Sequence, residues 1–164
     1  MRKEDGPDIE IRGLKSTDEA KICARMMADS EPWMTLRRCY DDSLRMLEDR
    51  SSETYLASAG DEIAGFVVIL MHGAFVGYIK TICVSPKWRN RGVGSWLMSF
   101  AEDRIFAEAP NVFICVSSFN VGARRFYERL GYEVVGELID YIVTGHSEIL
   151  MRKTIAPLDE FEKR

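Results

Sequence analysis

The chain has 164 residues, of which 46% are hydrophobic, and carries a formal net charge of −4 at pH 7. This length fits one globular domain, so we expect a single domain over residues 1–164, with a core at about 9–153 and a charged tail at 155–164. The acidic balance excludes a broad nucleic-acid-binding surface, which would need clustered lysine and arginine in excess.

The first third of the chain predicts one strand and two helices. Residues 9–14 alternate apolar and charged side chains, as a half-buried strand does, and residues 16–19 form a capping box for a helix that ends near residue 28. Pro32 breaks this helix, and Thr35 is expected to cap a second helix that continues to about residue 48.

The middle of the chain predicts an antiparallel meander. Strands are expected at 54–59, 63–71 and 75–84, with glycine-containing turns between them. The longest apolar stretch, 63–71, is much shorter than the roughly 20 residues of a membrane-spanning helix. Because the chain also starts without the apolar segment of a signal peptide, we expect no membrane partner and a cytoplasmic location.

The last part of the chain predicts a parallel strand pair. Pro86 stops the third meander strand, a glycine-rich turn follows, and apolar spacing indicates a helix at about 93–108. The nearly continuous apolar run 111–116 is typical of an interior strand parallel to its neighbour, which completes a right-handed βαβ unit. A short helix over about 120–130 and strands at 133–138 and 147–153 complete a mixed α/β domain with a mostly antiparallel central sheet.

The cysteine and histidine residues do not have the spacing of a metal site. None of the cysteines forms a Cys-x-x-Cys pair, and we expect all four to be buried free thiols: Cys23, Cys39, Cys83 and Cys115. The chain has only two histidines, and neither lies near a cysteine in sequence, so we predict no metal.

The turn between residues 84 and 94 has the features of a phosphate-binding loop. A helix N-terminus after a strand offers unpaired N–H groups and the positive end of the helix dipole to an anion. Gly92 and Gly94 place no Cβ in the way, and Asn90 tolerates left-handed backbone better than most residues do. The P-loop and Rossmann patterns both fail here, because no Gly-Lys-Ser/Thr follows and Leu97 stands where the third Rossmann glycine would be.

Two motifs in this order resemble the GCN5-related N-acetyltransferase (GNAT) superfamily. Arg89, Gly92 and Gly94 match its Arg/Gln-x-x-Gly-x-Gly/Ala pyrophosphate loop, and the segment 120–132, Asn-x-x-Ala-x-x-Phe-Tyr-x-x-x-Gly-Tyr, matches the next motif downstream. The order of strands and helices agrees over roughly residues 9–153. The resemblance implies helices on both faces of the sheet and a parallel strand pair that splays apart to admit the pantetheine arm of acetyl-coenzyme A.

The resemblance also implies which residues contact the co-substrate. The backbone of Ile82, Cys83 and Val84 is expected to pair with the pantetheine and to hold the oxyanion, while Asn120, Ala123 and Tyr127 lie beside it. The pyrophosphate is expected to lie against Arg89, Asn90, Arg91, Gly92, Val93, Gly94 and Ser95. Tyr127 is the expected general acid, because a phenol of pKa near 10 remains protonated at neutral pH and can protonate the departing thiolate.

The general base and the acceptor site are less defined. Many relatives place a glutamate on the strand before the phosphate loop, whereas residues 75–84 contain no carboxylate. Four residues remain as candidate bases: Glu31, His72, Asp140 and His146. Four aromatic or apolar residues fall in segments that border the acceptor site in the family: Trp33, Met34, Tyr40 and Tyr141.

The resemblance therefore implies an acetyl-coenzyme A dependent N-acetyltransferase that delivers an acetyl group to a primary amine, either a protein N-terminus or a small-molecule amine, by direct attack. A homodimer is compatible with the sequence, since dimers are common among similar proteins. Two alternatives remain: a non-catalytic acyl-coenzyme A sensor or partner module, which the missing strand carboxylate permits, and a nucleotide-phosphate binder that uses the same loop.

Overall fold

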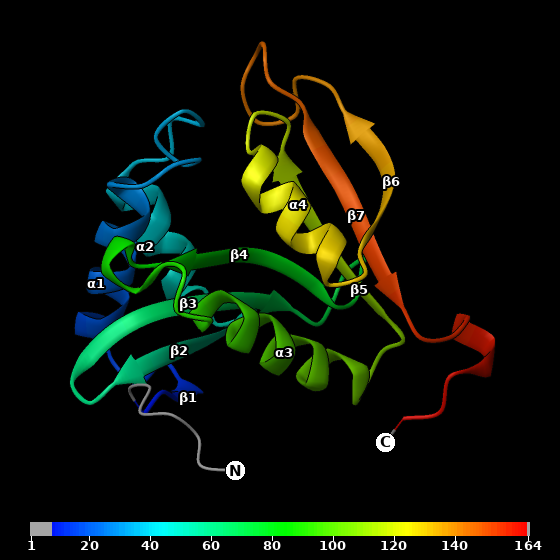
Figure 1. Cartoon of the computed structure of the whole chain (residues 1–164), viewed down its shortest axis with the longest axis horizontal. Coiled ribbons are helices and arrows are strands. Elements are labelled where there is room, and N and C mark those ends of the chain that lie inside the picture. Colours follow the sequence, from blue (N-terminus) through cyan, green and yellow to red (C-terminus); the bar gives the residue numbers. More distant parts are fainter. Residues whose placement is uncertain (1–7, 164) are drawn as a thin grey trace.

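A seven-stranded sheet in the order β1-β2-β3-β4-β5-β7-β6 runs through the protein, whose computed structural model describes residues 8–163 (Figure 1). The strands are β1 (Glu10–Gly13), β2 (Glu53–Ala59), β3 (Glu62–Leu70), β4 (Tyr78–Val84), β5 (Asn111–Ser117), β6 (Glu133–Leu138) and β7 (Glu148–Thr154). Every neighbouring pair is antiparallel except β4 and β5. The predicted mixed, mostly antiparallel sheet with one parallel pair is confirmed.

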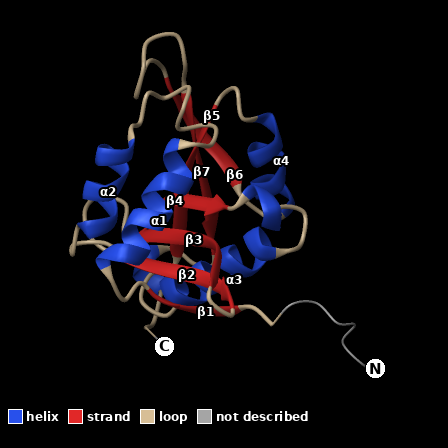
Figure 2. Ribbon diagram, turned by 90° about the vertical axis from the view of Figure 1, so that its left-hand side faces the viewer, coloured by secondary structure: helices blue, strands red, loops and turns tan. Residues whose placement is uncertain are grey.

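Helices cover both faces of this sheet, as predicted (Figure 2). The α-helices are α1 (Thr17–Ala28), α2 (Tyr40–Glu48), α3 (Val93–Phe106) and α4 (Val121–Arg129), and short 3-10 turns lie at Pro86–Trp88 and Leu158–Glu160. Side chains of α1 and α2 form one apolar cluster with alternate residues of β3, such as Phe66 and Val68. Side chains of α3 and α4 form a second cluster with the intervening positions, such as Val67 and Ile69, as the two-residue period of a strand requires.

The parallel pair opens along its length. Its recorded pairing is limited to Tyr78 with Phe113 and Ile79 with Ile114, although both strands continue for several residues. Lys80 is an extra residue in the β3–β4 ladder, because Thr81 pairs with Val68 while Ile79 pairs with the next residue, Ile69. Such a bulge bends a strand and increases its twist. The strands therefore separate at the position where the bulge occurs, which confirms the predicted splaying.

Three details differ from the sequence-based expectations. The second helix starts at Tyr40 rather than near Thr35, because the chain turns through residues 31–37 and Arg37 adopts a positive φ of 55°. The third meander strand starts at Tyr78 rather than Phe75, after a loop that ends at Gly77. Cys39 is exposed at the N-cap of α2, so the prediction that all four cysteines are buried is wrong for it, and Cys115 is only partly buried.

Gly77 allows β4 to begin beside β5. Its φ is 87°, and a Cβ built there would lie 2.4 Å from the Asn111 carbonyl oxygen and 2.6 Å from Ile105. We expect Gly77→Ala to destabilise the protein by about 2–4 kcal/mol, since it adds left-handed strain to a clash with rigid backbone. Urea unfolding measures this loss. Gly73→Ala is the matched control, because φ at Gly73 is 88° but nothing lies within 4 Å, so only the strain remains. Equal losses in the two variants would contradict the steric argument.

Candidate functional site

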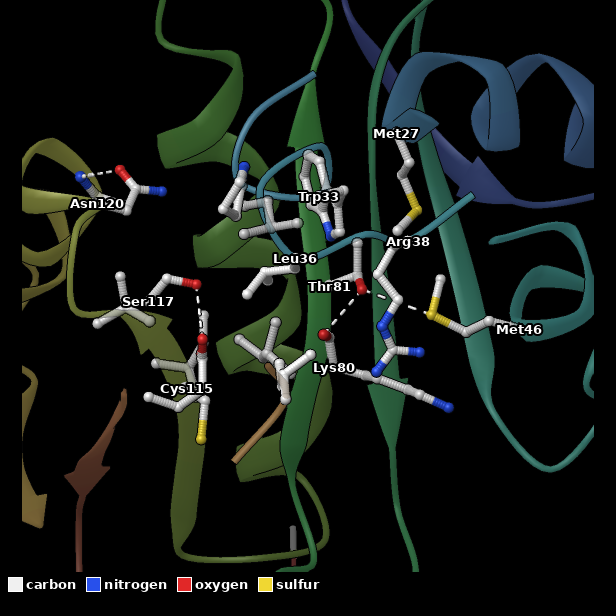
Figure 3. A pocket seen from close by; sticks show the side chains of 18 of the residues that line it. Met27, Trp33, Leu36, Arg38, Met46, Lys80, Thr81, Cys115, Ser117 and Asn120 are labelled. Carbon is white, nitrogen blue, oxygen red and sulfur yellow. Dashed lines mark hydrogen bonds between the residues drawn. The ribbon is translucent and has the colours of Figure 1, made fainter. Parts of the chain in front are cut away.

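A cavity of about 150 Å³ lies where β4 and β5 diverge. Figure 3 shows Lys80 and Thr81 on β4 and Cys115 and Ser117 on β5, the two strands that flank it. The remaining walls come from the end of α1, the α1–α2 connection, α2, α4 with its N-cap, the β6–β7 connection and the start of β7. The cavity is therefore bounded by elements from both halves of the chain, and it exists because the parallel pairing ends after two residue pairs.

One stripe of α4 faces this cavity. Asn120, Ala123 and Tyr127 line it, as their spacing along a helix allows. Asn120 is also the N-cap of the helix, where its Oδ1 accepts a hydrogen bond from the Ala123 N–H at 3.3 Å. The sequence-based expectation that these three side chains share a ligand-facing stripe agrees with this geometry, while their contacts with a co-substrate stay a prediction.

The Tyr127 hydroxyl has no hydrogen-bond partner within residues 8–163. The side chain is 6% exposed and packs edge-on against Tyr132, with ring centroids 6.0 Å apart. Burial raises the pKa of this phenol above its ordinary value of 10. Since no buried polar side-chain atom in the described part of the chain is left without a partner, the hydroxyl is not sealed off from the cavity that the residue lines. A protonated phenol is thus available to a ligand there.

The predicted phosphate loop offers a row of free amides. Asn90 and Gly92 have positive φ values of 58° and 83°, and the first hydrogen bond of α3 is donated by the Trp96 N–H to the Gly92 carbonyl. Within the described residues, no acceptor is recorded for the backbone N–H groups of residues 90–95. Together with the positive end of the helix dipole, these amides can hold an anion.

The loop lies outside the cavity but next to α4. A Cβ on Gly94 would lie 3.5 Å from the Phe126 ring, so the start of α3 packs beside the helix that carries Tyr127. The Trp88 indole anchors the other side, where its N–H donates to Glu62 Oε1 at 3.0 Å, and the Arg91 guanidinium lies 5.3 Å from its ring centroid. Arg89 Nε donates to the Val84 carbonyl oxygen at 3.2 Å. The loop therefore packs beside α4, the helix that carries Tyr127 into the cavity wall.

The other predicted co-substrate residues on β4 differ in their surroundings. Ile82 lines the cavity, whereas Cys83 is buried in the apolar cluster under α1 and α2. Because the expected contacts of these residues are made by the backbone, the burial of the Cys83 side chain does not remove them. Past Ile79 the edge of β4 that faces β5 has no strand partner in the described part of the chain, so its amides and carbonyls are accessible to an extended ligand.

None of the four candidate bases lines the cavity, and each has a local role. The Glu31 carboxylate accepts a hydrogen bond from the Thr35 N–H at 3.1 Å, and the Asp140 carboxylate accepts one from the Gly145 N–H at 2.7 Å. His72 Nε2 lies 2.9 Å from the Ser51 carbonyl oxygen. The His146 ring packs edge-on against Phe119, with centroids 4.9 Å apart. The structure therefore does not bring these groups to the splayed strands.

The predicted acceptor-side residues separate into two pairs. Trp33 and Tyr141 line the cavity, from the α1–α2 connection and the β6–β7 connection. Tyr40 does not line it and instead lies under the Arg25 guanidinium, 4.4 Å from the ring centroid. Met34 is 57% exposed and is not part of the cavity wall.

Sequence reasoning missed a carboxylate in the cavity wall. Glu148, the first residue of β7, is buried and accepts a hydrogen bond from the Ser117 hydroxyl at 2.7 Å. Its signal in the sequence is an acidic residue directly before a short apolar run, Glu148-Ile-Leu-Met151. Buried acids of this kind are uncommon unless they are paired. The signal does not show which face of the sheet the residue occupies, so the sequence alone did not connect it to the site.

Within residues 8–163 no group of three or more metal-ligating side chains is close enough together to hold a metal ion. In the same range, no helix combines the length and the apolar character that crossing a membrane requires.

Comparisons with known proteins agree with this geometry. The model of the Acetyltransferase (GNAT) family matches residues 20–132, which is more than half of the chain. An uncharacterised N-acetyltransferase of Methanocaldococcus jannaschii is 32% identical over 101 residues, which cover 60% of this chain. The match spans 64% of the length of that relative.

Solved structures share the fold. The ribosomal-protein-S18-alanine N-acetyltransferase from Escherichia coli superposes with a TM-score of 0.73 at 18% identity, covering 93% of this chain and 97% of that one. An aminoglycoside 6'-N-acetyltransferase complexed with coenzyme A superposes with a TM-score of 0.71 at 18% identity, covering 90% and 98% of the two chains.

Proposed function

Because the chain belongs to the GNAT family of acetyltransferases, we propose that it transfers the acetyl group of acetyl-coenzyme A to a primary amine by direct attack. One observation carries this proposal. The buried Tyr127 hydroxyl, which has no partner in the described part of the chain, lines the cavity between β4 and β5, next to a loop of free amides at the start of α3.

The loop and the cavity edge suit the two ends of acetyl-coenzyme A. The free N–H groups of residues 90–95 suit a diphosphate, and the unpaired edge of β4 beyond Ile79 suits the amide-containing pantetheine arm. A structurally similar aminoglycoside acetyltransferase was solved with coenzyme A, which supports the same choice of ligand here. No metal enters this proposal.

The residues of the chain have separable tasks in the transfer. Acetyl-coenzyme A supplies a thioester, in which the bond from the acyl carbon to sulfur breaks as the amine nitrogen bonds to that carbon. Backbone N–H groups of β4 at Ile82 to Val84 are proposed to hold the developing oxyanion. Tyr127 gives its phenolic proton to the departing sulfur, and the phenol is reprotonated from the amine, which must lose one proton to become an amide.

The acceptor is proposed to enter between the α1–α2 and β6–β7 connections, past Trp33 and Tyr141. The enzymes in the two similar structures act on different acceptors, a ribosomal protein and an aminoglycoside. The comparisons therefore support the reaction class but do not favour one acceptor.

Thermal shift and thiol release test the proposal together. Acetyl-coenzyme A at about 100 times its Kd adds about 2.7 kcal/mol of stability, which should raise the Tm by roughly 5–10 °C. ATP and NAD should have no such effect. A panel of amines that includes peptide N-termini, polyamines and aminoglycosides should then contain at least one compound that releases free coenzyme A thiol.

Two outcomes would contradict this function. Binding of acetyl-coenzyme A without thiol release from any amine would favour the non-catalytic sensor. Equal Tm shifts with ATP or NAD would favour a nucleotide-phosphate binder.

A further inference from the structure

Within residues 8–163, the Glu148 carboxylate accepts one hydrogen bond, and its donor is a neutral hydroxyl. Glu148 pairs directly with Ser117 across β5 and β7, and the Ser117 hydroxyl donates to its Oε1 at 2.7 Å (Figure 3). The residue is 4% exposed. Its other oxygen has no donor in the described part of the chain, and it is not a sealed, unsatisfied atom, so it faces the cavity that the residue lines.

This carboxylate lacks the cation that the other partly buried carboxylates have. Within residues 8–163, salt bridges of 4.0 Å or less join Glu19 to Arg12, Glu53 to Arg104 and Glu102 to Lys153, but none involves Glu148. Removing a carboxylate from water without a counter-charge is costly. Burial accordingly raises the pKa of Glu148 above its ordinary value, against the opposing hydrogen bond from Ser117.

The titratable and charged groups around Glu148 come from six elements. Ser117 and Cys115 lie on β5. Tyr78 lies on β4, where burial and the negative charge of Glu148 raise the pKa of its phenol. Arg38 in the α1–α2 connection lowers the pKa of Glu148 through its charge, without a salt bridge. Tyr141 in the β6–β7 connection and Tyr127 on α4 complete the titratable groups of the same cavity, together with Lys80 and Asp42. Of the carboxylates that line the cavity, Asp42 already accepts from Arg45 and from the Cys39 thiol, so Glu148 is the one left without a charged partner.

We propose that Glu148 is the general base of the transfer: its cavity-facing oxygen takes the proton that the incoming ammonium group must lose before it attacks. This inference rests on the proposed acetyltransferase function. It places the base on β7, which is separated from β4 by β5. Many relatives carry a glutamate on the strand that corresponds to β4, but β4 of this chain has no carboxylate.

The protons balance across the two residues. An ammonium group enters with three protons; one remains on the amide nitrogen, one passes to Glu148 and then to solvent, and one replaces the proton that Tyr127 gives to sulfur. A carboxyl whose pKa lies nearer neutrality is a better base for this step than an exposed glutamate, since base strength rises with pKa while the group still ionises at working pH.

Glu148→Gln tests the base directly. The amide keeps the size of the side chain and can still accept from Ser117, so we expect a normal Tm and unchanged acetyl-coenzyme A binding with a fall in kcat/KM of about 100-fold at pH 7. Glu137→Gln is the matched control, because it makes the same change on exposed β6 and should keep wild-type activity. Activity of Glu148→Gln within threefold of Glu137→Gln, with the same pH profile, would overturn the inference.

Ser117→Ala provides a second test that keeps Glu148 in place. Activity needs the ionised carboxylate, so kcat/KM should fall as pH falls through the pKa of Glu148. The Ser117 hydrogen bond lowers that pKa, so its removal should move this acidic limb to higher pH. An unmoved limb would overturn the role of Glu148, even if Glu148→Gln fails to fold. If wild-type protein releases no thiol with any amine, the proposed function itself fails, whereas an active wild type with these variants unaffected sinks the base alone.

Discussion

Gly94→Asp should raise the Kd for acetyl-coenzyme A by about 100-fold or more without unfolding the protein. A Cβ at Gly94 meets Phe126 at 3.5 Å and Val84 at 3.8 Å, which are ordinary van der Waals contacts. An aspartate in the first turn of α3 also suits the helix dipole. In the complex, however, its carboxylate takes the place proposed for a phosphate, and a like charge within about 5 Å costs about 3 kcal/mol at an effective dielectric constant of 20.

The matched control for this change is Gly122→Asp. Gly122 also lies in the first turn of a helix, α4, is exposed, and has nothing within 4 Å of a built Cβ. This variant should bind acetyl-coenzyme A like the wild type. Isothermal titration of both variants measures the difference. A Gly94→Asp protein that binds acetyl-coenzyme A as tightly as the Gly122→Asp protein would remove the pyrophosphate from this loop.

The fold and the left-handed turn before α3 were predictable because their signals are local. Strand alternation, the capping box at Ser16 and the glycines at 92 and 94 depend on neighbours within a few residues, and the structure has a strand, a helix and a left-handed turn at these places. The predicted start of α2 was wrong. Thr35 is a suitable N-cap residue by type, but the positive φ of Arg37, which prevents a helix there, depends on how the whole α1–α2 connection packs.

The side chains of the proposed catalytic site were only partly predictable, because segments far apart in the sequence form the cavity. The helical stripe of Asn120 and Tyr127 follows from their spacing, and both line the cavity. No spacing in the sequence predicts that Glu148 lines the cavity, because its hydrogen-bond partner Ser117 is 31 residues away. The family resemblance points to a base on β4, where this chain has no carboxylate, and the four candidates named instead lie in or beside connections. The divergence of β4 from β5 exposes the start of β7 to the cavity.

Tyr127→Phe should lower kcat by about 1,000-fold while leaving KM for acetyl-coenzyme A and the Tm nearly unchanged. The phenylalanine ring keeps the packing against Phe126 and Tyr132, and the lost hydroxyl had no hydrogen-bond partner within residues 8–163, so stability has little to lose. Because burial raises the pKa of Tyr127, the wild-type rate should hold to at least about pH 10 before deprotonation of this phenol reduces it.

Tyr132→Phe is the control that separates chemistry from packing. Tyr132 touches Tyr127 but turns its hydroxyl away from the cavity, where it donates to Glu102 Oε1 at 3.0 Å. Loss of this partly buried hydrogen bond to a charged group should cost about 1.5–3 kcal/mol of stability, with kcat unchanged. We therefore expect opposite results for the two variants. Tyr127→Phe should lower kcat and keep its Tm, whereas Tyr132→Phe should lower the Tm and keep its kcat. If Tyr127→Phe loses Tm rather than rate, this phenol belongs to the core and the sulfur takes its proton from another source.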